Sequence, residues 1–161
     1  MKQIKVFVMD VDGTMTDGKI YMGDSGEMFK AFDIKDGYGI HEMLPEHQVK
    51  TAIMTGRTSQ IVVNRAKELE IDYVLQNVKD KKKSIIELAN EIGCDLQEIA
   101  YIGDDIIDIG PMELCGVSGC PADAADEVKD VVDFVSVKSG GCSAVRDFIE
   151  WLIAEKYIRE V

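Results

Sequence analysis

Three apolar runs of the sequence end in side chains that could do chemistry. Asp10 and Asp12 follow the run IKVFVM, Thr55 follows VKTAIM, and the acidic sequence GDDIID, which begins at residue 103, follows IAYI. A lone Asp-x-Asp pair or a lone Thr-Gly is more often a helix cap or a turn. Because these features end three separate apolar runs, we interpret them together as one candidate site.

The residue types in this candidate site favour phosphoryl transfer. Clustered carboxylates repel one another unless a cation neutralises them, and Mg²⁺ prefers oxygen ligands. Such a site would attract a phosphate, and the Asp10 carboxylate could attack phosphorus to form an aspartyl phosphate. Asp12, two residues further on in an extended segment, would point the same way and could protonate the leaving oxygen and then activate water. Thr55 and Lys81 would hold the phosphate oxygens.

The elements that must position these residues follow from the hydrophobic pattern. The predicted strands are Ile4–Met9, Val49–Met54, Tyr73–Leu75, Ile99–Ile102, Gly116–Val117 and Asp133–Val135. Apolar residues at helical spacing predict helices between them, starting from a first helix at about Gly37–Leu44 and including the stripes Val62/Ala66/Leu69, Ile85/Leu88/Ala89/Ile92 and Val145/Phe148/Ile149/Leu152. Alternating strands and helices predict an α/β fold with a doubly wound parallel sheet. In such a sheet ligands bind beyond the carboxyl ends of the strands.

One segment breaks this alternation. Lys19–Met22 and Glu27–Phe32 flank the turn-forming sequence GDSG, which predicts a β-hairpin directly after the first strand. The 42 residues between Asp12 and Thr55 and the 25 between Thr55 and Lys81 are used by these elements, so we expect no cap domain. No linker or repeat is evident, and residues 1–161 are predicted to form a single domain.

Composition narrows the function classes. The chain has 161 residues, of which 46% are hydrophobic, and 30 acidic against 18 basic residues give a net charge of −12. An acidic chain without a basic stripe argues against binding to nucleic acid or to anionic membranes. No run approaches the roughly 18 apolar residues of a membrane span, and the first apolar run is too short for a secretion signal. The four cysteines form no CxxC pair, so we expect reduced thiols and a cytoplasmic protein.

Four motifs, taken in order, carry a resemblance to a known superfamily. They are Asp10-Val11-Asp12-Gly13-Thr14, Thr55-Gly56, Lys81 and Gly103-Asp104-Asp105 with Asp108. With these motifs the chain resembles the haloacid dehalogenase superfamily of aspartate-nucleophile phosphatases. The resemblance implies a Rossmann-like fold and Mg²⁺ as cofactor.

Flanking features favour one capless subgroup, and the resemblance to it covers roughly the whole chain. The matching segments are DGTMTDG from residue 12, KDGYGI from residue 35, TGR from residue 55, YIGDD from residue 101 and GGCSAVR from residue 140. They are similar to those of the 3-deoxy-D-manno-octulosonate 8-phosphate (Kdo 8-phosphate) phosphatases. One departure is Asn77, which stands where the subgroup usually has glycine.

The resemblance also implies roles for individual residues. Asp10 would be the nucleophile and a Mg²⁺ ligand, and Asp12 would be the acid/base and a ligand through its backbone carbonyl. Asp104 would be the third protein ligand, with Asp105 or Asp108 behind it. Thr55, Gly56 and Lys81 would bind the phosphate.

The substrate suggested by the resemblance is Kdo 8-phosphate, and a nine-carbon sugar acid 9-phosphate of the sialic acid type is the alternative. Related nine-carbon enzymes often carry an acidic residue at the position of Arg57, so Arg57 favours the eight-carbon acid. Arg57 and Arg65 could bind a sugar carboxylate, because guanidinium pairs with carboxylate in bidentate fashion. Both arginines could equally be surface or ion-pairing residues.

Two further readings compete with an active phosphatase. A receiver domain, which is a regulatory phosphoacceptor module, also combines acidic residues, a threonine and a lysine on a doubly wound sheet, but in a different order. A phosphatase-like scaffold without activity is the other reading, although every motif residue is present.

The assembly follows from the missing cap. A small-substrate enzyme must exclude water from its site, so a capless chain needs a large substrate or a neighbouring subunit. The apolar hairpin residues Ile20, Met22, Met28, Phe29 and Phe32 need burial, either on their own domain or between subunits. The resemblance implies a homotetramer in which the hairpin, and residues 155–161, line the neighbouring site.

Overall fold

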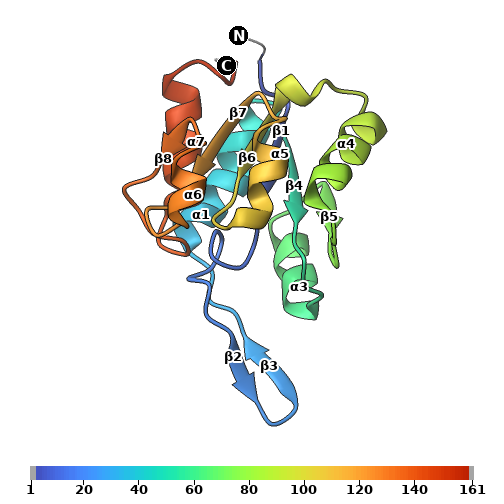
Figure 1. The fold of residues 1–161 in the computed structure, drawn as a ribbon, viewed down its shortest axis with the longest axis vertical. Helices are drawn as coiled ribbons and strands as arrows, with labels where there is room; N and C mark the ends of the chain where they lie inside the picture. Colours follow the sequence, from blue (N-terminus) through green and yellow to red (C-terminus); the bar gives the residue numbers. More distant parts are fainter. Residues whose placement is uncertain (1–2, 160–161) are drawn as a thin grey trace.

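The sheet that dominates the fold has six parallel strands. The computed structural model describes residues 3–159, and its strand order is β5-β4-β1-β6-β7-β8 (Figure 1). The strands are β1 Val6–Met9, β4 Lys50–Met54, β5 Tyr73–Leu75, β6 Ile99–Ile102, β7 Val117–Cys120 and β8 Phe134–Val135. Every neighbouring pair is parallel. The predicted α/β fold with a doubly wound parallel sheet is therefore confirmed.

Helices cover both faces of this sheet. They are α1 Ile34–Tyr38, α2 Leu44–Glu46, α3 Gln60–Glu68, α4 Lys81–Ile92, α5 Ile109–Met112, α6 Asp126–Lys129 and α7 Ala144–Ala154. Phe7 and Met9 of β1 belong to a core cluster with residues of α2, α3 and α7, and Val6 and Val8 belong to a second cluster with residues of α4, α5 and α6. Because alternate residues of one strand are buried on opposite faces, the strand is apolar throughout instead of alternating with polar residues.

The strand order reverses its direction beside the first strand. From β1 the chain winds outward through β4 to β5, then crosses back to place β6 on the other side of β1. The reversal puts the carboxyl ends of β1 and β6 next to each other, at the point where ligands bind in open α/β sheets. Two of the three predicted acidic or hydroxyl segments follow these two strands.

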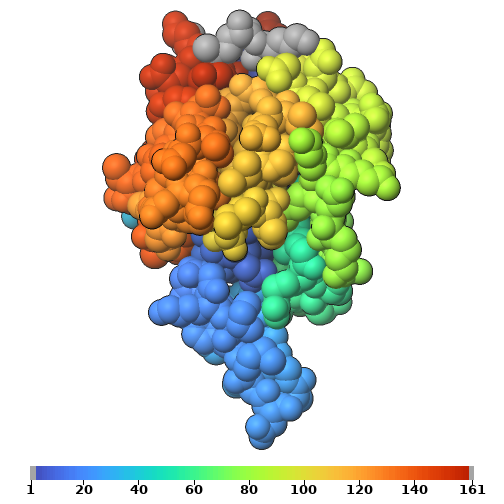
Figure 2. Space-filling view, in the orientation of Figure 1, coloured from blue at the N-terminus to red at the C-terminus, as the bar shows by residue number. Residues whose placement is uncertain are grey.

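The hairpin projects away from the sheet (Figures 1 and 2). Its strands are β2 Tyr21–Gly23 and β3 Gly26–Phe29, which pair antiparallel around a two-residue turn. Met22, Met28 and Phe29 are 61%, 65% and 49% exposed. The alternative that these three pack on their own domain is therefore wrong for this chain, whereas Phe32 does pack against the core.

Several predicted boundaries differ from the structure. The first helix begins at Ile34, not at Gly37, because the Asp33 carboxylate accepts a hydrogen bond from the Lys35 N–H and caps it. It continues through a π-helical segment, Gly39–Met43, into α2. The fifth strand, predicted at Gly116–Val117, is Val117–Cys120.

Packing explains why the fifth strand continues past Val117, where the sequence predicts its end. A Cβ at Gly119 would lie 2.9 Å from the Phe148 ring of α7, so the strand needs a residue that scores poorly as a strand former. Tertiary packing here overrides local propensity.

In residues 3–159, the connections between the sheet strands contain no cap domain. They carry helices and the hairpin. Within the same residues, no helix combines the length and apolar character that crossing a membrane requires.

The described part of residues 155–161 packs on its own chain: Tyr157 accepts a hydrogen bond from the Ile4 N–H at 2.8 Å, and Ile158 is buried. This contact lies at the amino end of β1, and residues 160 and 161 lie outside the described residues.

Candidate active site

Asp10 lies at the centre of the site. It follows β1 directly, and its N–H donates to the Ile102 carbonyl at the end of β6 at 3.0 Å. One Asp10 carboxylate oxygen accepts a hydrogen bond from the Lys81 Nζ at 2.6 Å. The same ammonium lies 2.7 Å from Asp108. All three side chains are almost fully buried, so the lysine is held between two carboxylates out of contact with water.

Helix α4 delivers this lysine. Asp80 caps the helix by accepting a hydrogen bond from the Lys83 N–H at 2.9 Å, which makes Lys81 the first helical residue. Its side chain reaches Asp10 and Asp108, whereas the neighbouring Lys83 side chain is 71% exposed and pairs with Glu87. The structure therefore places Lys81, of the lysines in this run, against Asp10.

Asp108 and Asp105 have different surroundings. Asp108 is 0% exposed and accepts hydrogen bonds from the Tyr101 hydroxyl, from Lys81 and from two backbone N–H groups, those of residues 104 and 105. Asp105 is exposed, and its carboxylate caps the following 3₁₀ turn by accepting from the Ile106 N–H. Of the two candidates for the place behind Asp104, the structure brings Asp108 into the cluster and leaves Asp105 at the surface.

Asp104 completes the acidic group. Oxygen atoms of Asp10, Asp104 and Asp108 lie within 4.8 Å of one another. Asp104 accepts a hydrogen bond from the Thr14 hydroxyl at 3.1 Å. A Cβ at Gly13 would lie 2.0 Å from an Asp104 oxygen, and Gly13 has a φ of +96°. Only glycine lets the turn after Asp12 adopt this backbone and leave room for the carboxylate.

Burial sets the electrostatics of this group. It raises the pKa of Asp10 well above its usual value, with the nearby Asp108 adding to the rise and Lys81 opposing it. Burial also raises the pKa of Asp104 to about 6. Lys81 provides one positive charge for three carboxylates, so the cluster retains an excess of negative charge. Three close carboxylates with one lysine fit a hard divalent cation such as Mg²⁺, which prefers oxygen ligands.

The predicted phosphate-binding segment lies at the same edge of the sheet. Thr55 is buried directly after β4, the neighbour of β1, and its hydroxyl accepts from the Arg57 N–H at 3.4 Å. Gly56 follows it in the loop that leads to α3. The backbone of Thr55 is held by two hydrogen bonds. Its N–H donates to the Leu75 carbonyl, and its carbonyl accepts from the Val78 N–H.

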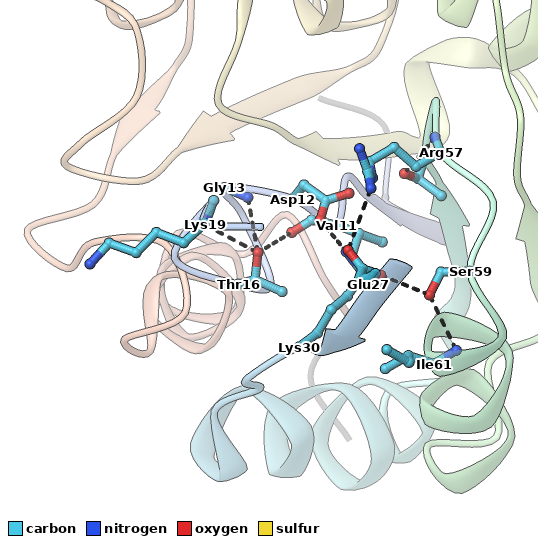
Figure 3. Close-up of polar contacts among 12 residues, drawn as sticks. Val11, Asp12, Gly13, Thr16, Lys19, Glu27, Lys30, Arg57, Ser59 and Ile61 are labelled. Carbon is cyan, nitrogen blue, oxygen red and sulfur yellow. Dashed lines mark hydrogen bonds and ion pairs between the residues drawn. The ribbon is translucent and has the colours of Figure 1, made fainter. Parts of the chain in front are cut away.

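Asp12 has a partner that sequence reasoning missed. Its carboxylate forms an ion pair with Lys30, which follows β3 of the hairpin and whose side chain is 1% exposed (Figure 3). Lys30 also pairs with Glu27 at 3.1 Å. Glu27 in turn accepts hydrogen bonds from Ser59 and Arg57. No local signal marks these hairpin residues, because their contacts are with residues distant in the sequence that follow β1 and β4.

The two arginines considered for substrate binding are placed differently. Arg57 is half exposed beside the network in Figure 3 and lies 3.5 Å from Glu27. Arg65 pairs with Glu68 at 2.9 Å and lies over the Phe32 ring at 5.5 Å. The contacts of Arg65 therefore hold α3 to Phe32, and of the two arginines Arg57 is the one linked to Asp12, through Glu27 and then Lys30.

Comparison with known proteins agrees with this geometry. A model of haloacid dehalogenase-like hydrolases matches residues 73–149. The 3-deoxy-D-manno-octulosonate 8-phosphate phosphatase of Yersinia pestis is 38% identical over 150 residues, which are 93% of this chain and 80% of that protein.

Solved structures give the same picture. The cobalt-bound deoxy-D-mannose-octulosonate 8-phosphate phosphatase of Haemophilus influenzae superposes with a TM-score of 0.91 and 35% identity, covering 96% of this chain and 90% of that one. The Moraxella catarrhalis 3-deoxy-D-manno-octulosonate 8-phosphate phosphatase, solved with magnesium, phosphate and KDO, has a TM-score of 0.91 and 37% identity, covering 95% and 87%.

Proposed function

The chain belongs to the haloacid dehalogenase-like hydrolases, in the group of 3-deoxy-D-manno-octulosonate 8-phosphate phosphatases, and from this premise we propose that it hydrolyses Kdo 8-phosphate through a covalent intermediate on Asp10. The observation that carries the mechanism is the group formed by the buried Asp10 and Lys81 with the partly buried Asp104 at the carboxyl ends of β1 and β6. This group combines a nucleophile, a cation and excess negative charge where the fold binds ligands.

In the first step Asp10 attacks phosphorus. The Asp10 oxygen that is not bonded to Lys81 forms the new bond, and the bond between phosphorus and the sugar oxygen breaks. Asp12 gives its proton to that oxygen, so the sugar acid leaves with a neutral hydroxyl group at that position. Lys81 and the Thr55 hydroxyl hold the phosphoryl oxygens during the transfer.

In the second step water attacks the aspartyl phosphate. Asp12, now ionised, takes a proton from the water as the new phosphorus–oxygen bond forms. The bond between phosphorus and Asp10 breaks, which releases phosphate and returns both carboxyl groups to their starting states. Splitting the hydrolysis in this way replaces one difficult displacement with two easier ones.

Mg²⁺ is the cofactor of this reaction. The carboxylates of Asp10 and Asp104 and the backbone carbonyl of Asp12 would hold it, and it supplies positive charge that offsets the repulsion between the phosphate and the carboxylates. Asp108 already accepts hydrogen bonds on both oxygens, so its role is to orient Lys81 and the backbone of Asp104.

The substrate is the finer part of the proposal. It is supported by the relatives, which act on the 8-phosphate of an eight-carbon sugar acid. Arg57 supports it as well, because its half-exposed guanidinium lies beside the network around Asp12 and could bind a carboxylate.

The test is a comparison of kcat/KM for Kdo 8-phosphate, a nine-carbon sugar acid 9-phosphate and glucose 6-phosphate under identical conditions. We expect the kcat/KM for Kdo 8-phosphate to exceed that for the hexose phosphate by about a hundredfold. Converted to free energy, this ratio is of the order that one desolvated carboxylate–arginine pair contributes. A tenfold preference for glucose 6-phosphate would overturn the sugar-acid assignment. A preference for the nine-carbon acid would replace the eight-carbon substrate.

We also propose that the enzyme is a homotetramer. The exposed apolar residues Met22, Met28 and Phe29 on the projecting hairpin support burial against other copies of the chain. The number of subunits comes from the resemblance. Light scattering of the purified protein tests it, and a fully active monomer would contradict it. The cytoplasmic location remains a prediction from the sequence.

A further inference from the structure

A buried lysine stands out on an otherwise exposed hairpin. Lys30 follows β3 immediately, and its side chain is 1% exposed, whereas Met28 and Phe29 just before it are largely open to solvent. Burying an ammonium group is costly unless it is paired. The hairpin nevertheless directs this one cation inward, toward the acidic residues that follow β1.

The Asp12 carboxylate depends on this lysine. Within residues 3–159, Lys30 is the one group that donates a hydrogen bond to that carboxylate, and the Asp12 side chain is 19% exposed. An aspartate without such a partner would be free to change its side-chain rotamer. The ion pair fixes the direction in which the second oxygen of Asp12 points.

Glu27 extends the contact to a second part of the site. It lies 3.1 Å from the Lys30 Nζ, and it accepts hydrogen bonds from the Ser59 hydroxyl at 3.2 Å and from the Arg57 guanidinium at 3.5 Å (Figure 3). Ser59 caps α3 through the Ile61 N–H. The hairpin thus joins Asp12 to the loop that carries Thr55 and Arg57.

We propose that Lys30 is a positioning residue of the phosphatase reaction, which holds the Asp12 carboxylate toward the leaving oxygen, and that Glu27 holds Lys30 in place. The proposal rests on the proposed roles of Asp10 and Asp12 and adds a part for the hairpin within its own subunit. The hairpin then serves both for contact between subunits and for arranging the acid/base group.

This role has a consequence that a purely structural role lacks. A sugar oxygen must gain a proton as it leaves, so its departure depends on where Asp12 stands. A p-nitrophenolate ion is a stable leaving group and departs without that proton. Misplacing Asp12 should therefore slow formation of the aspartyl phosphate from a sugar phosphate far more than from p-nitrophenyl phosphate. A general loss of folded protein would slow both equally.

The experiment measures kcat/KM for both substrates in three variants, because this parameter reports the steps up to the first irreversible one. For Lys30→Met we expect a loss of about thirtyfold with Kdo 8-phosphate, which is part of the roughly hundredfold or more that general acid catalysis contributes, and of at most about threefold with p-nitrophenyl phosphate. Lys30→Arg, which keeps the charge, should recover most of the loss. Lys19→Met is the matched control, because Lys19 belongs to the same projecting segment and its side chain is exposed and points away from Asp12 in Figure 3. It should match the wild type on both substrates.

A second variant keeps the test decisive if Lys30→Met does not fold. Glu27→Gln removes the charge that holds Lys30 and should give the same substrate-dependent loss to a smaller extent. Equal losses on both substrates, or no loss, would overturn the positioning role. A wild-type protein that hydrolyses neither substrate, or an Asp10→Asn variant as active as wild type, would instead overturn the proposed function.

Discussion

Lys81 shows how one residue can serve both folding and chemistry. Its ammonium lies between Asp10 and Asp108, at 2.6 and 2.7 Å, with almost no exposure to water. Burial alone lowers the pKa of Lys81, but the two carboxylates outweigh this and raise it, so the lysine remains charged. It therefore orients Asp10, and in the proposed mechanism it also binds the phosphate.

Replacing this lysine tests that double role. Lys81→Met leaves two buried carboxylates without their cation, so we expect the free energy of unfolding to fall by about 3 kcal/mol. We also expect kcat/KM to fall at least about a hundredfold. Urea unfolding and steady-state kinetics measure the two effects. Lys83→Met, in the same turn of α4 with an exposed side chain, should change neither. Wild-type stability in Lys81→Met would contradict the buried ion pair.

The two acidic residues after Asp104 provide a second test at this scale. Asp108→Asn replaces a carboxylate oxygen with an NH₂ group, which cannot accept hydrogen bonds, so in either orientation of the amide part of the network around Lys81 and Asp104 is lost. Activity should fall by about a hundredfold or more, whereas Asp105→Asn should stay within about threefold of wild type. The opposite ranking in steady-state assays would show that Asp105 is the residue that supports the site.

Sequence reasoning at the residue scale found what strand ends reveal. Asp10, Thr55 and Asp104 each follow an apolar run, and parallel topology brings such positions to one edge. Tyr101 was missed as a partner of Asp108 because it lies inside a strand and is indistinguishable from a core aromatic residue. Lys30 was missed because the hairpin strands separate it from Asp12 in the sequence, so no short motif contains both residues.

At the scale of elements, α1 and α7 are joined through a buried carboxylate. Asp36 of α1 is 3% exposed, and it accepts a hydrogen bond from the Arg146 N–H of α7 at 2.8 Å. Its other oxygen has no partner among the described residues. Burial raises the pKa of Asp36 to about 7; the nearby Asp33 adds to the rise, and Arg65 opposes it.

The raised pKa of Asp36 predicts a pH-dependent stability. The folded protein keeps this proton up to a pH of about 7, whereas the unfolded chain releases it above a pH of about 4. The contribution of Asp36 to the free energy of unfolding therefore falls as the pH rises through this window. Asp36→Asn does not titrate. The free energy of unfolding of wild type minus that of Asp36→Asn should therefore fall by roughly 2 kcal/mol between about pH 5 and about pH 8. Urea unfolding at several pH values measures this, and a constant difference would contradict it.

The elements were predictable to different degrees. Tyr73–Leu75 and Ile99–Ile102 are observed with the predicted bounds, because both runs are rich in apolar and aromatic strand formers. The predicted start of the first helix was wrong because the observed start is set by the Asp33 cap and the helix contains a glycine in its middle. Gly39 is used there for close packing, since a Cβ would lie 3.0 Å from the Ile149 side chain of α7. Packing of this kind has no local signature.

At the scale of the whole molecule, the site is a property of strand order. Because β6 returns to the side of β1 opposite β4, carboxylates that are far apart in the sequence lie together in the structure. Burial, with repulsion between the carboxylates adding to it, raises the pKa values of Asp10 and Asp104, and a divalent cation that offsets the carboxylate charges would therefore be favoured here.

This predicts the response to metal ions. Chelation should abolish activity, and Mg²⁺ or Mn²⁺ should restore it, whereas Ca²⁺, which takes more ligands in looser geometry, should not. Mg²⁺ should also raise the Tm of wild type by binding the folded state, and it should not do so for Asp104→Asn. Thermal unfolding with and without the ion checks this independently of turnover. Full activity in excess chelator would contradict the metal assignment.

If Asp10 forms the covalent bond to phosphorus, replacing its carboxylate with an amide must abolish turnover, whereas the same replacement at Asp105 must not. The measurement is kcat/KM of wild type, Asp10→Asn and Asp105→Asn for Kdo 8-phosphate with Mg²⁺. We predict that Asp10→Asn loses activity by about ten-thousandfold, because an amide is not a nucleophile, while Asp105→Asn remains within about threefold of wild type. An Asp10→Asn variant within about tenfold of wild type would contradict the claim.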